Sequence, residues 1–285
     1  MSNKESLIWH PFTPLITDHE PLNVVKGEGV YLHTEDGQQI IDAVSSWWVS
    51  IHGHGNKDIA KAIYDQALEL EHVIFAGFTH NPALKLVKNL KQIVPEGITK
   101  FFFSDDGSTS IEVALKMAFQ YWYNQGIHNK TKVIAIKGAY HGDTFGSMSV
   151  GDRSVFSKPF FPFLFDIELL DFPYNGKEKE VIKQFEQFTD QGDIASFIFE
   201  PLVQGSGGMR MYSPELLDKL IDIARSKGII CIADEVMTGF GRTGKLFATD
   251  YLKNDADIMC LSKGLTGGTM AMGITACNQK IVDAF

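Results

Sequence analysis

The chain contains the run Ile229-Ile230-Cys231-Ile232-Ala233-Asp234-Glu235, and further along it contains Ile258-Met259-Cys260-Leu261-Ser262-Lys263. Both runs begin with short apolar segments, which are typical of strands buried on both faces of a parallel sheet. The first run ends on an acid, Asp234, and the second ends on an amine, Lys263. The pattern predicts that both side chains lie at the carboxyl ends of strands, where open α/β sheets bind ligands.

An acid and a lysine in one crevice suit a particular chemistry. A lysine can form a Schiff base with an aldehyde cofactor, and an acid can keep a pyridine nitrogen protonated so that the ring accepts electrons. The alternative is a structural ion pair at the sheet edge, since many such pairs have no catalytic role. Asp234 and Lys263 alone leave both interpretations open.

Flanking segments extend the α/β pattern. From about residue 98, apolar runs alternate with helical periodicity, which predicts a mainly parallel central sheet with flanking helices. The expected strands are 100–103, 132–136, 196–199, 229–233, 258–261 and 273–277, and the expected helices are 111–123, 181–188 and 214–226.

Two domains are expected. Residues 1–55 predict an N-terminal arm and a small antiparallel meander with an Asp-Gly turn at residues 36–37. Residues 56–285 predict a large α/β domain. The helical pattern that starts at Gln279 stops at Phe285, so we expect the sequence to be interrupted there, with a C-terminal small domain largely absent.

Composition narrows the possible partners. Hydrophobic residues make up 44% of the chain and charged residues 21%, as in ordinary globular proteins. The net charge of −9 argues against nucleic acid or an anionic membrane as a partner. We find no leader, no apolar run long enough to span a bilayer and no metal-binding motif. The three cysteines lie in apolar runs without CxxC spacing, which predicts buried thiols in the cytoplasm.

Two further strand ends carry candidate ligand-binding groups. Gly107 and Ser108 lie in a hydroxyl-rich turn between a strand and a helix, where backbone N–H groups and the helix dipole can bind phosphate. The simpler alternative is helix capping by a box at residues 109–112. Beyond the next strand, Gly138 and Gly142 flank Tyr140, which leaves room for a flat ring to stack on the phenol. That tyrosine could instead merely pack on a turn.

The order of these residues is similar to that of a known family. Residues 234–244, followed by Ser262-Lys263-Gly264, resemble the class III (omega) aminotransferases, which are pyridoxal 5'-phosphate enzymes of fold type I. The resemblance implies that Lys263 forms the Schiff base, that Asp234 binds the pyridine nitrogen and that Tyr140 stacks on the ring. It also implies cofactor contacts from Gly107, Ser108 and Val236, and a homodimer.

Within this class, the chain resembles the branch that acts in biotin synthesis. Residues 9–13, 45–48, 140–144, 207–212 and 265–269 carry this resemblance. It implies amino transfer from S-adenosylmethionine to 8-amino-7-oxononanoate. The implied substrate contacts are Phe12, Trp47, Tyr140, Asp143 and Lys263. If the tandem Trp47 and Trp48 are extended, their side chains point to opposite sides, with Trp47 lining the substrate pocket and Trp48 packing into protein.

Three departures from the family pattern leave alternatives open. Met237 stands where many members have Gln, Phe12 stands where some have Tyr, and the substrate-binding arginine of the family lies beyond Phe285. One alternative is another omega-aminotransferase, acting on ornithine, 4-aminobutyrate or a similar amine, although the tandem tryptophans argue against it. The other is a cofactor-binding fragment without turnover.

Overall fold

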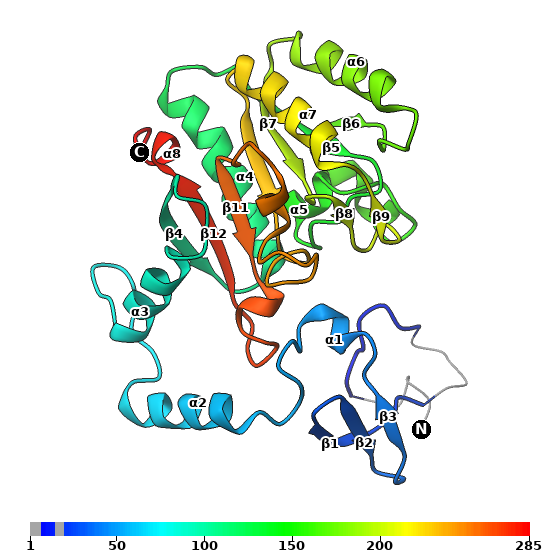
Figure 1. Cartoon of the computed structure of the whole chain (residues 1–285), viewed down its shortest axis with the longest axis vertical. Coiled ribbons are helices and arrows are strands. Elements are labelled where there is room, and N and C mark those ends of the chain that lie inside the picture. The colour runs from blue at the N-terminus through cyan, green and yellow to red at the C-terminus, as the bar shows by residue number, and fades with distance from the viewer. Residues whose placement is uncertain (1–6, 15–19) are drawn as a thin grey trace. The chain divides into compact units, whose positions relative to one another are not determined.

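The computed structural model describes residues 7–14 and 20–285 (Figure 1). The chain divides into two compact units, one ending at Glu71 and the other beginning at His72. Helix α2 (Lys57–Glu69) therefore belongs to the first unit. The boundary predicted from the sequence, at residue 55, lies before this helix.

The first unit contains the expected antiparallel meander. Its strands are β1 (Val24–Glu28), β2 (Tyr31–Thr34) and β3 (Gln39–Ile41), and β2 pairs with both neighbours. Gly37 adopts a φ of +85° in the turn between β2 and β3, a conformation that glycine adopts without steric cost. The prediction of a meander with a turn at this position is confirmed.

The tandem tryptophans are not extended, so that part of the prediction was wrong. Ser45, Ser46, Trp47 and Trp48 all have φ between +49° and +68°, and they form a short left-handed turn assigned as α1 (Ser45–Trp48). The Asp42 carboxylate accepts hydrogen bonds from the Ser46 backbone N–H at 2.9 Å and from its hydroxyl at 2.7 Å. These bonds stabilise a conformation that is costly for residues other than glycine.

The second unit is built on a seven-stranded sheet with the order β4-β12-β11-β10-β7-β5-β6. Its strands are β4 (Ile98–Ser104), β5 (Lys132–Ile136), β6 (Glu168–Leu170), β7 (Ile194–Phe199), β10 (Ile230–Asp234), β11 (Ile258–Leu261) and β12 (Gly273–Asn278). The pairs from β6 to β11 are parallel, and β12 is antiparallel to both β11 and β4. Every strand except β12 therefore ends at the same edge of the sheet.

Alternate residues of the central strand pack on opposite faces of this sheet. Ile230 and Ile232 join a core with α4 (Gly107–Asn124), and Cys231 and Ala233 join a core with α6 (Glu178–Thr189) and α7 (Pro214–Ser226). Figure 1 shows these helices flanking the sheet. Helices on both faces of a mainly parallel sheet confirm the predicted α/β class.

The predicted strands and helices occur, but their ends differ. Helix α4 starts at Gly107, because Asp106 and Thr109 form the capping box: the Asp106 carboxylate accepts from the Thr109 backbone N–H at 2.7 Å. The box expected at residues 109–112 was wrong. This earlier start places Gly107 and Ser108 in the first helical turn.

Smaller elements complete the second unit. They are α3 (Asn81–Leu90), α5 (Phe145–Ser149), α8 (Gln279–Val282), the hairpin β8 (Val203–Gln204) and β9 (Arg210–Met211), and 3₁₀ turns at Lys158–Phe163, Ala248–Tyr251 and Lys263–Leu265. Among the residues that the structure describes, no helix has the length and apolar character needed to cross a membrane.

Candidate active site

The shared strand edge of the second unit brings the predicted acid and amine onto neighbouring strands. Asp234 is the last residue of β10, and Lys263 lies two residues beyond the end of β11. The two strands are parallel, with Asp234 opposite Cys260. The arrangement expected from the sequence, an acid and a lysine at one sheet edge, is therefore present.

Lys263 has an unusual backbone and a perturbed amine. Its φ of +46° is left-handed, a conformation that is uncommon for residues with a Cβ atom and often found at functional sites. Burial lowers the pKa of the Lys263 amine, the carboxylates of Asp234 and Glu200 oppose this effect, and Arg242 adds to the lowering. A lowered pKa increases the neutral fraction of the amine, which is the nucleophilic form.

The Asp234 carboxylate is buried and bonded at both oxygens. Its Oδ1 accepts from the backbone N–H of Val236 at 3.0 Å, and its Oδ2 lies 2.7 Å from Nδ1 of His141. Asp234 is only 4% exposed. Its orientation is therefore fixed before any ligand binds.

Tyr140 lies on the turn after β5 and is held from two sides. Its hydroxyl donates to Oδ2 of Asp143 at 2.8 Å, and its backbone N–H donates to Oε1 of Glu200 at 3.1 Å. Burial raises the pKa of the Tyr140 phenol, and the Asp143 carboxylate raises it further, so the phenol stays protonated. Asp143 thus orients the predicted stacking residue.

The first turn of α4 is tightly enclosed. A Cβ added to Gly107 would lie 2.7 Å from Cγ1 of Val236, and a Cβ on Gly142 would lie 2.2 Å from Oγ of Ser108. Oγ of Ser108 also lies 2.8 Å from Oγ1 of Thr144 and accepts from its backbone N–H at 3.0 Å. A helix N-terminus with close glycine approaches provides a compact site for an anion such as phosphate.

Two buried residues of this site were missed as candidates. His141 contacts Asp234, and Glu200 accepts from the backbone N–H groups of Tyr140 and Gly205. Both lie in runs that the sequence marks as polar strand ends, beside Tyr140 and directly after β7. That position was the available signal, although it does not show which polar residue points inward.

The Glu200 carboxyl is expected to titrate near neutral pH. Burial raises its pKa from the ordinary 4.5 to about 7; the neighbouring Asp234 raises it too, whereas the two backbone N–H groups that it accepts from lower it. Between pH 4.5 and about pH 7, Glu200 is therefore mostly ionised in the unfolded chain but still largely protonated in the folded chain. The free energy of unfolding should therefore fall as pH rises from about 4.5 to 7, by up to about 1.4 kcal/mol per pH unit from this group.

Carboxyl ¹³C NMR tests this prediction, because the Glu200 resonance should titrate with a midpoint near pH 7. The Glu200→Gln variant identifies that resonance by its loss. A midpoint near the ordinary pKa of 4.5 would show that burial does not destabilise the charged form of Glu200.

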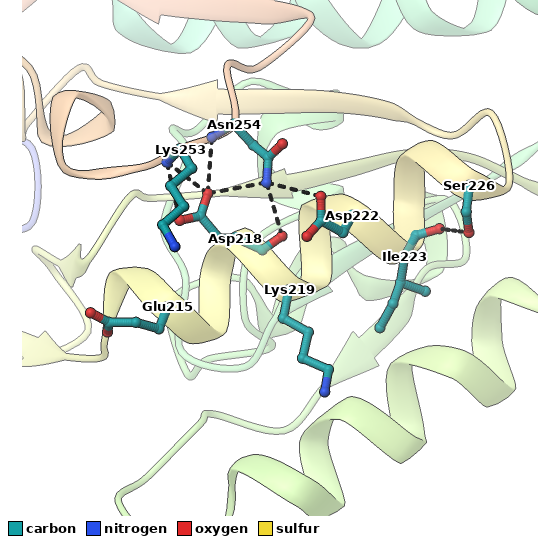
Figure 2. A pocket seen from close by; sticks show the side chains of 8 residues that line it. All are labelled: Glu215, Asp218, Lys219, Asp222, Ile223, Ser226, Lys253 and Asn254. Atoms are coloured by element: carbon teal, nitrogen blue, oxygen red, sulfur yellow. Dashed lines mark hydrogen bonds between the residues drawn. The ribbon is translucent and has the colours of Figure 1, made fainter.

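A separate hollow lies on the outer face of α7 (Figure 2). Its lining residues are Glu215, Asp218, Lys219, Asp222, Ile223, Ser226, Lys253 and Asn254, none of which is a predicted site residue. The Asp218 carboxylate accepts from the backbone N–H groups of Lys253 and Asn254 at 2.9 and 3.0 Å. The hydrogen-bonding capacity of Asp218 is thus used to join α7 to the loop that leads into β11.

Three further observations bear on the sequence predictions. Across the described parts of the chain, no group of three or more His, Cys, Asp or Glu side chains could hold a metal ion. The three cysteines are buried free thiols, as expected. In the first unit, the rings of Phe12 and Trp47 make an edge-to-face contact with centroids 5.7 Å apart.

Comparison with known proteins identifies the family of this chain. Residues 15–285 match the sequence profile of the family Aminotransferase class-III. The chain belongs to the class III aminotransferases. These enzymes use pyridoxal 5'-phosphate, so the predicted family, fold type and cofactor are confirmed.

Several relatives that the chain matches share one name. The adenosylmethionine-8-amino-7-oxononanoate aminotransferase of Synechococcus elongatus is 50% identical over 98% of this chain and 67% of its own length. That of Geobacter sulfurreducens is 39% identical over 98% of this chain and 65% of its own length. The crystal structure of the enzyme with this name from Methanocaldococcus jannaschii has a TM-score of 0.92 at 37% identity, over 98% of this chain and 65% of that one.

Amine transaminases share the same fold. The structure of one from an uncultivated Pseudomonas species, in a pyridoxal-phosphate-bound form, has a TM-score of 0.92 at 33% identity, over 99% of this chain and 67% of that one. The chain thus spans about two thirds of the length of the relatives it matches.

Proposed function

We propose that this chain carries the cofactor site of a pyridoxal-phosphate aminotransferase that moves an amino group from S-adenosylmethionine to 8-amino-7-oxononanoate, in biotin synthesis. The observation that carries the proposal is the placement of Lys263 and Asp234 at the carboxyl ends of adjacent parallel strands, beside a glycine-bounded helix N-terminus. The 50% identity to the Synechococcus elongatus enzyme supports the choice of substrates.

The residues present fit this cofactor. Lys263 would hold it covalently through Nζ, Asp234 would bind its ring nitrogen, and Gly107 and Ser108 would bind its phosphate. The side chains of Val236 and Tyr140 would contact its ring. The contact that a Cβ at Gly107 would make with Val236 explains why glycine stands at the phosphate end. When bound, the cofactor supplies an electron sink for the carbon that carries the amino group.

The side chains of the chain itself supply orientation and proton transfer. Asp234 keeps the ring nitrogen protonated, since a carboxylate next to a cation favours both charged forms. Lys263 moves the proton at the substrate carbon, a role for which its lowered pKa suits it. The hydrogen bond from Tyr140 to Asp143 fixes the phenol against the ring that it is proposed to contact.

Substrate contacts are proposed for Phe12, Trp47, Tyr140, Asp143 and Lys263. Trp47 is 58% exposed although its side chain is a large apolar group, and its edge-to-face contact with Phe12 forms an aromatic pair. An exposed aromatic pair on a protein surface often marks a binding site. A flat apolar wall of this kind suits the methylene chain of 8-amino-7-oxononanoate.

In the active enzyme, Trp47→Ala is expected to raise the KM for 8-amino-7-oxononanoate. The expected loss in kcat/KM is about 1–3 kcal/mol, as for the removal of a few apolar contacts. Trp48→Ala serves as the matched control and should mainly lower the thermal unfolding temperature. Unchanged substrate kinetics in Trp47→Ala, or an exchange of the two phenotypes, would contradict the assignment.

A product assay tests the proposed function. The enzyme is incubated with pyridoxal phosphate, 8-amino-7-oxononanoate and either S-adenosylmethionine, ornithine, 4-aminobutyrate or a simple amine, and 7,8-diaminononanoate is quantified. Product with S-adenosylmethionine supports the proposal. Conversion of only the other amines would favour the second candidate, an omega-aminotransferase of the kind seen among the structural relatives. Cofactor binding without any product would favour a binding fragment without turnover.

We also propose that the enzyme works as a homodimer in the cytoplasm. The family resemblance supports the dimer, and the three buried free thiols suit a reducing compartment.

A further inference from the structure

The ring of His141 occupies an unusual environment next to the proposed cofactor site. Its side chain is fully buried, and its Nδ1 lies 2.7 Å from Oδ2 of Asp234. Its other nitrogen, Nε2, is buried and has no hydrogen-bond partner among the described residues. Buried polar atoms without a partner are rare and call for a specific explanation.

The contacts of Asp234 assign the proton on this ring. An ionised carboxylate only accepts hydrogen bonds, so Nδ1 of His141 must be the donor to Asp234. A proton on Nε2 as well would leave a buried, charged N–H group without an acceptor, which is more costly than an unused lone pair. The contacts therefore favour the neutral ring with its proton on Nδ1.

We propose that His141 is a positioning residue that, as the neutral Nδ1–H tautomer, holds the Asp234 carboxylate charged and in one orientation. This inference rests on the proposed function, in which Asp234 binds the protonated ring nitrogen of the cofactor. The Val236 N–H fixes one carboxylate oxygen and His141 fixes the other. A hydrogen bond to the charged form favours that form, which is the one that the ring nitrogen requires.

The same contact has a second consequence for the site. His141 follows Tyr140 directly, so one short turn carries both the proposed stacking residue and the partner of Asp234. Glu200 holds this turn through the Tyr140 backbone N–H. The position of His141, and through it that of Asp234, thus depends on the turn after β5.

Two amide substitutions separate positioning from simple packing. The amide nitrogen of asparagine is the same number of bonds from Cα as Nδ1, and that of glutamine matches Nε2. His141→Asn therefore retains a donor for Asp234, whereas His141→Gln moves the donor toward the position of Nε2. Comparison of the two variants holds the polarity of the replacement constant.

The ligands are pyridoxal phosphate and its 1-deaza analogue, in which a C–H group replaces the ring nitrogen. We expect His141→Gln to weaken the binding of pyridoxal phosphate by about tenfold, as the loss of a hydrogen bond to a charged group should. His141→Asn should bind close to wild type. Neither variant should change the affinity for the analogue, which has no ring nitrogen to bind.

A second readout needs no cofactor and no activity. In protein labelled with ¹⁵N-histidine, the His141 ring should show a protonated Nδ1 and an unprotonated Nε2. A proton on Nε2 alone, or on both nitrogens, would overturn the inference.

The binding experiment also separates this inference from the proposed function. Equal losses for both ligands in His141→Gln, or no loss for either, would show that His141 does not act through the ring nitrogen. If wild type binds neither ligand, the proposed cofactor site itself is wrong, and the inference fails with it.

Discussion

Replacing Lys263 by alanine is expected to abolish the formation of 7,8-diaminononanoate, with a loss of about 10⁴-fold in rate because the proton-transfer group is removed. The variant should also lose the visible absorbance band of a cofactor held covalently. The reason lies in the fold: Lys263 lies two residues beyond the end of β11, the strand next to the one that ends on Asp234, and burial of its amine favours the neutral form.

Lys137 offers a matched control. It directly follows another parallel strand of this sheet, β5, but its amine is half-exposed and pairs with Asp171 at 2.5 Å. Lys137→Ala should keep both the absorbance band and the product. Substantial turnover in Lys263→Ala would mean that another amine transfers the proton at the substrate carbon.

The second large effect is expected for Asp234→Asn. The amide is nearly the same size and can still pack beside Val236 and His141, but it carries no charge to hold a protonated ring nitrogen. Preorganised charges matter most where charge develops in the transition state, so kcat should fall by about 10²–10³-fold. Cofactor occupancy should fall much less.

Kinetic and binding measurements on the same preparation check this separation. Occupancy is measured by absorbance titration with pyridoxal phosphate, and kcat is measured at saturating cofactor. Equal losses in occupancy and rate would indicate that Asp234 has a structural role and does not act on the transition state.

Much of the second unit could be predicted from sequence because its strands are buried on both faces. The run Ile230–Ala233 divides its side chains between two cores, and this demands continuous apolar residues that stand out in the sequence. Parallel strands end at the same edge of a sheet, so Asp234 and Lys263 could be expected to lie near one another from the sequence alone. Pro214 and Ser213 likewise mark the start of α7.

Other elements lack such a local signal. β6 (Glu168–Leu170) has only three residues and only one that is fully buried, and β8 and β9 have two residues each. The left-handed turn at Trp47 depends on hydrogen bonds that Ser46 donates to the Asp42 carboxylate, and no glycine marks it. Tertiary contacts determine these conformations, whereas side-chain preference alone favours extended tryptophans.

The buried polar residues His141 and Glu200 were harder to predict from the sequence than the rest of the site. His141 and Glu200 contact residues that are distant in sequence, Asp234 and Tyr140 respectively, and hydrogen-bond pairing of this kind leaves no periodic pattern. Tyr140 could be chosen because its flanking glycines are visible in the sequence. The orientation of the next residue, His141, into the core requires the structure.

Reduction with borohydride followed by peptide mass spectrometry tests the central claim most directly. Wild-type protein is incubated with excess pyridoxal phosphate, reduced and digested, and the modified lysine is identified. We expect the pyridoxyl group on Lys263, and much less on Lys137 or any other lysine. A modification spread evenly over exposed lysines, or concentrated on a lysine other than Lys263, would contradict the assignment of this strand edge as the cofactor site.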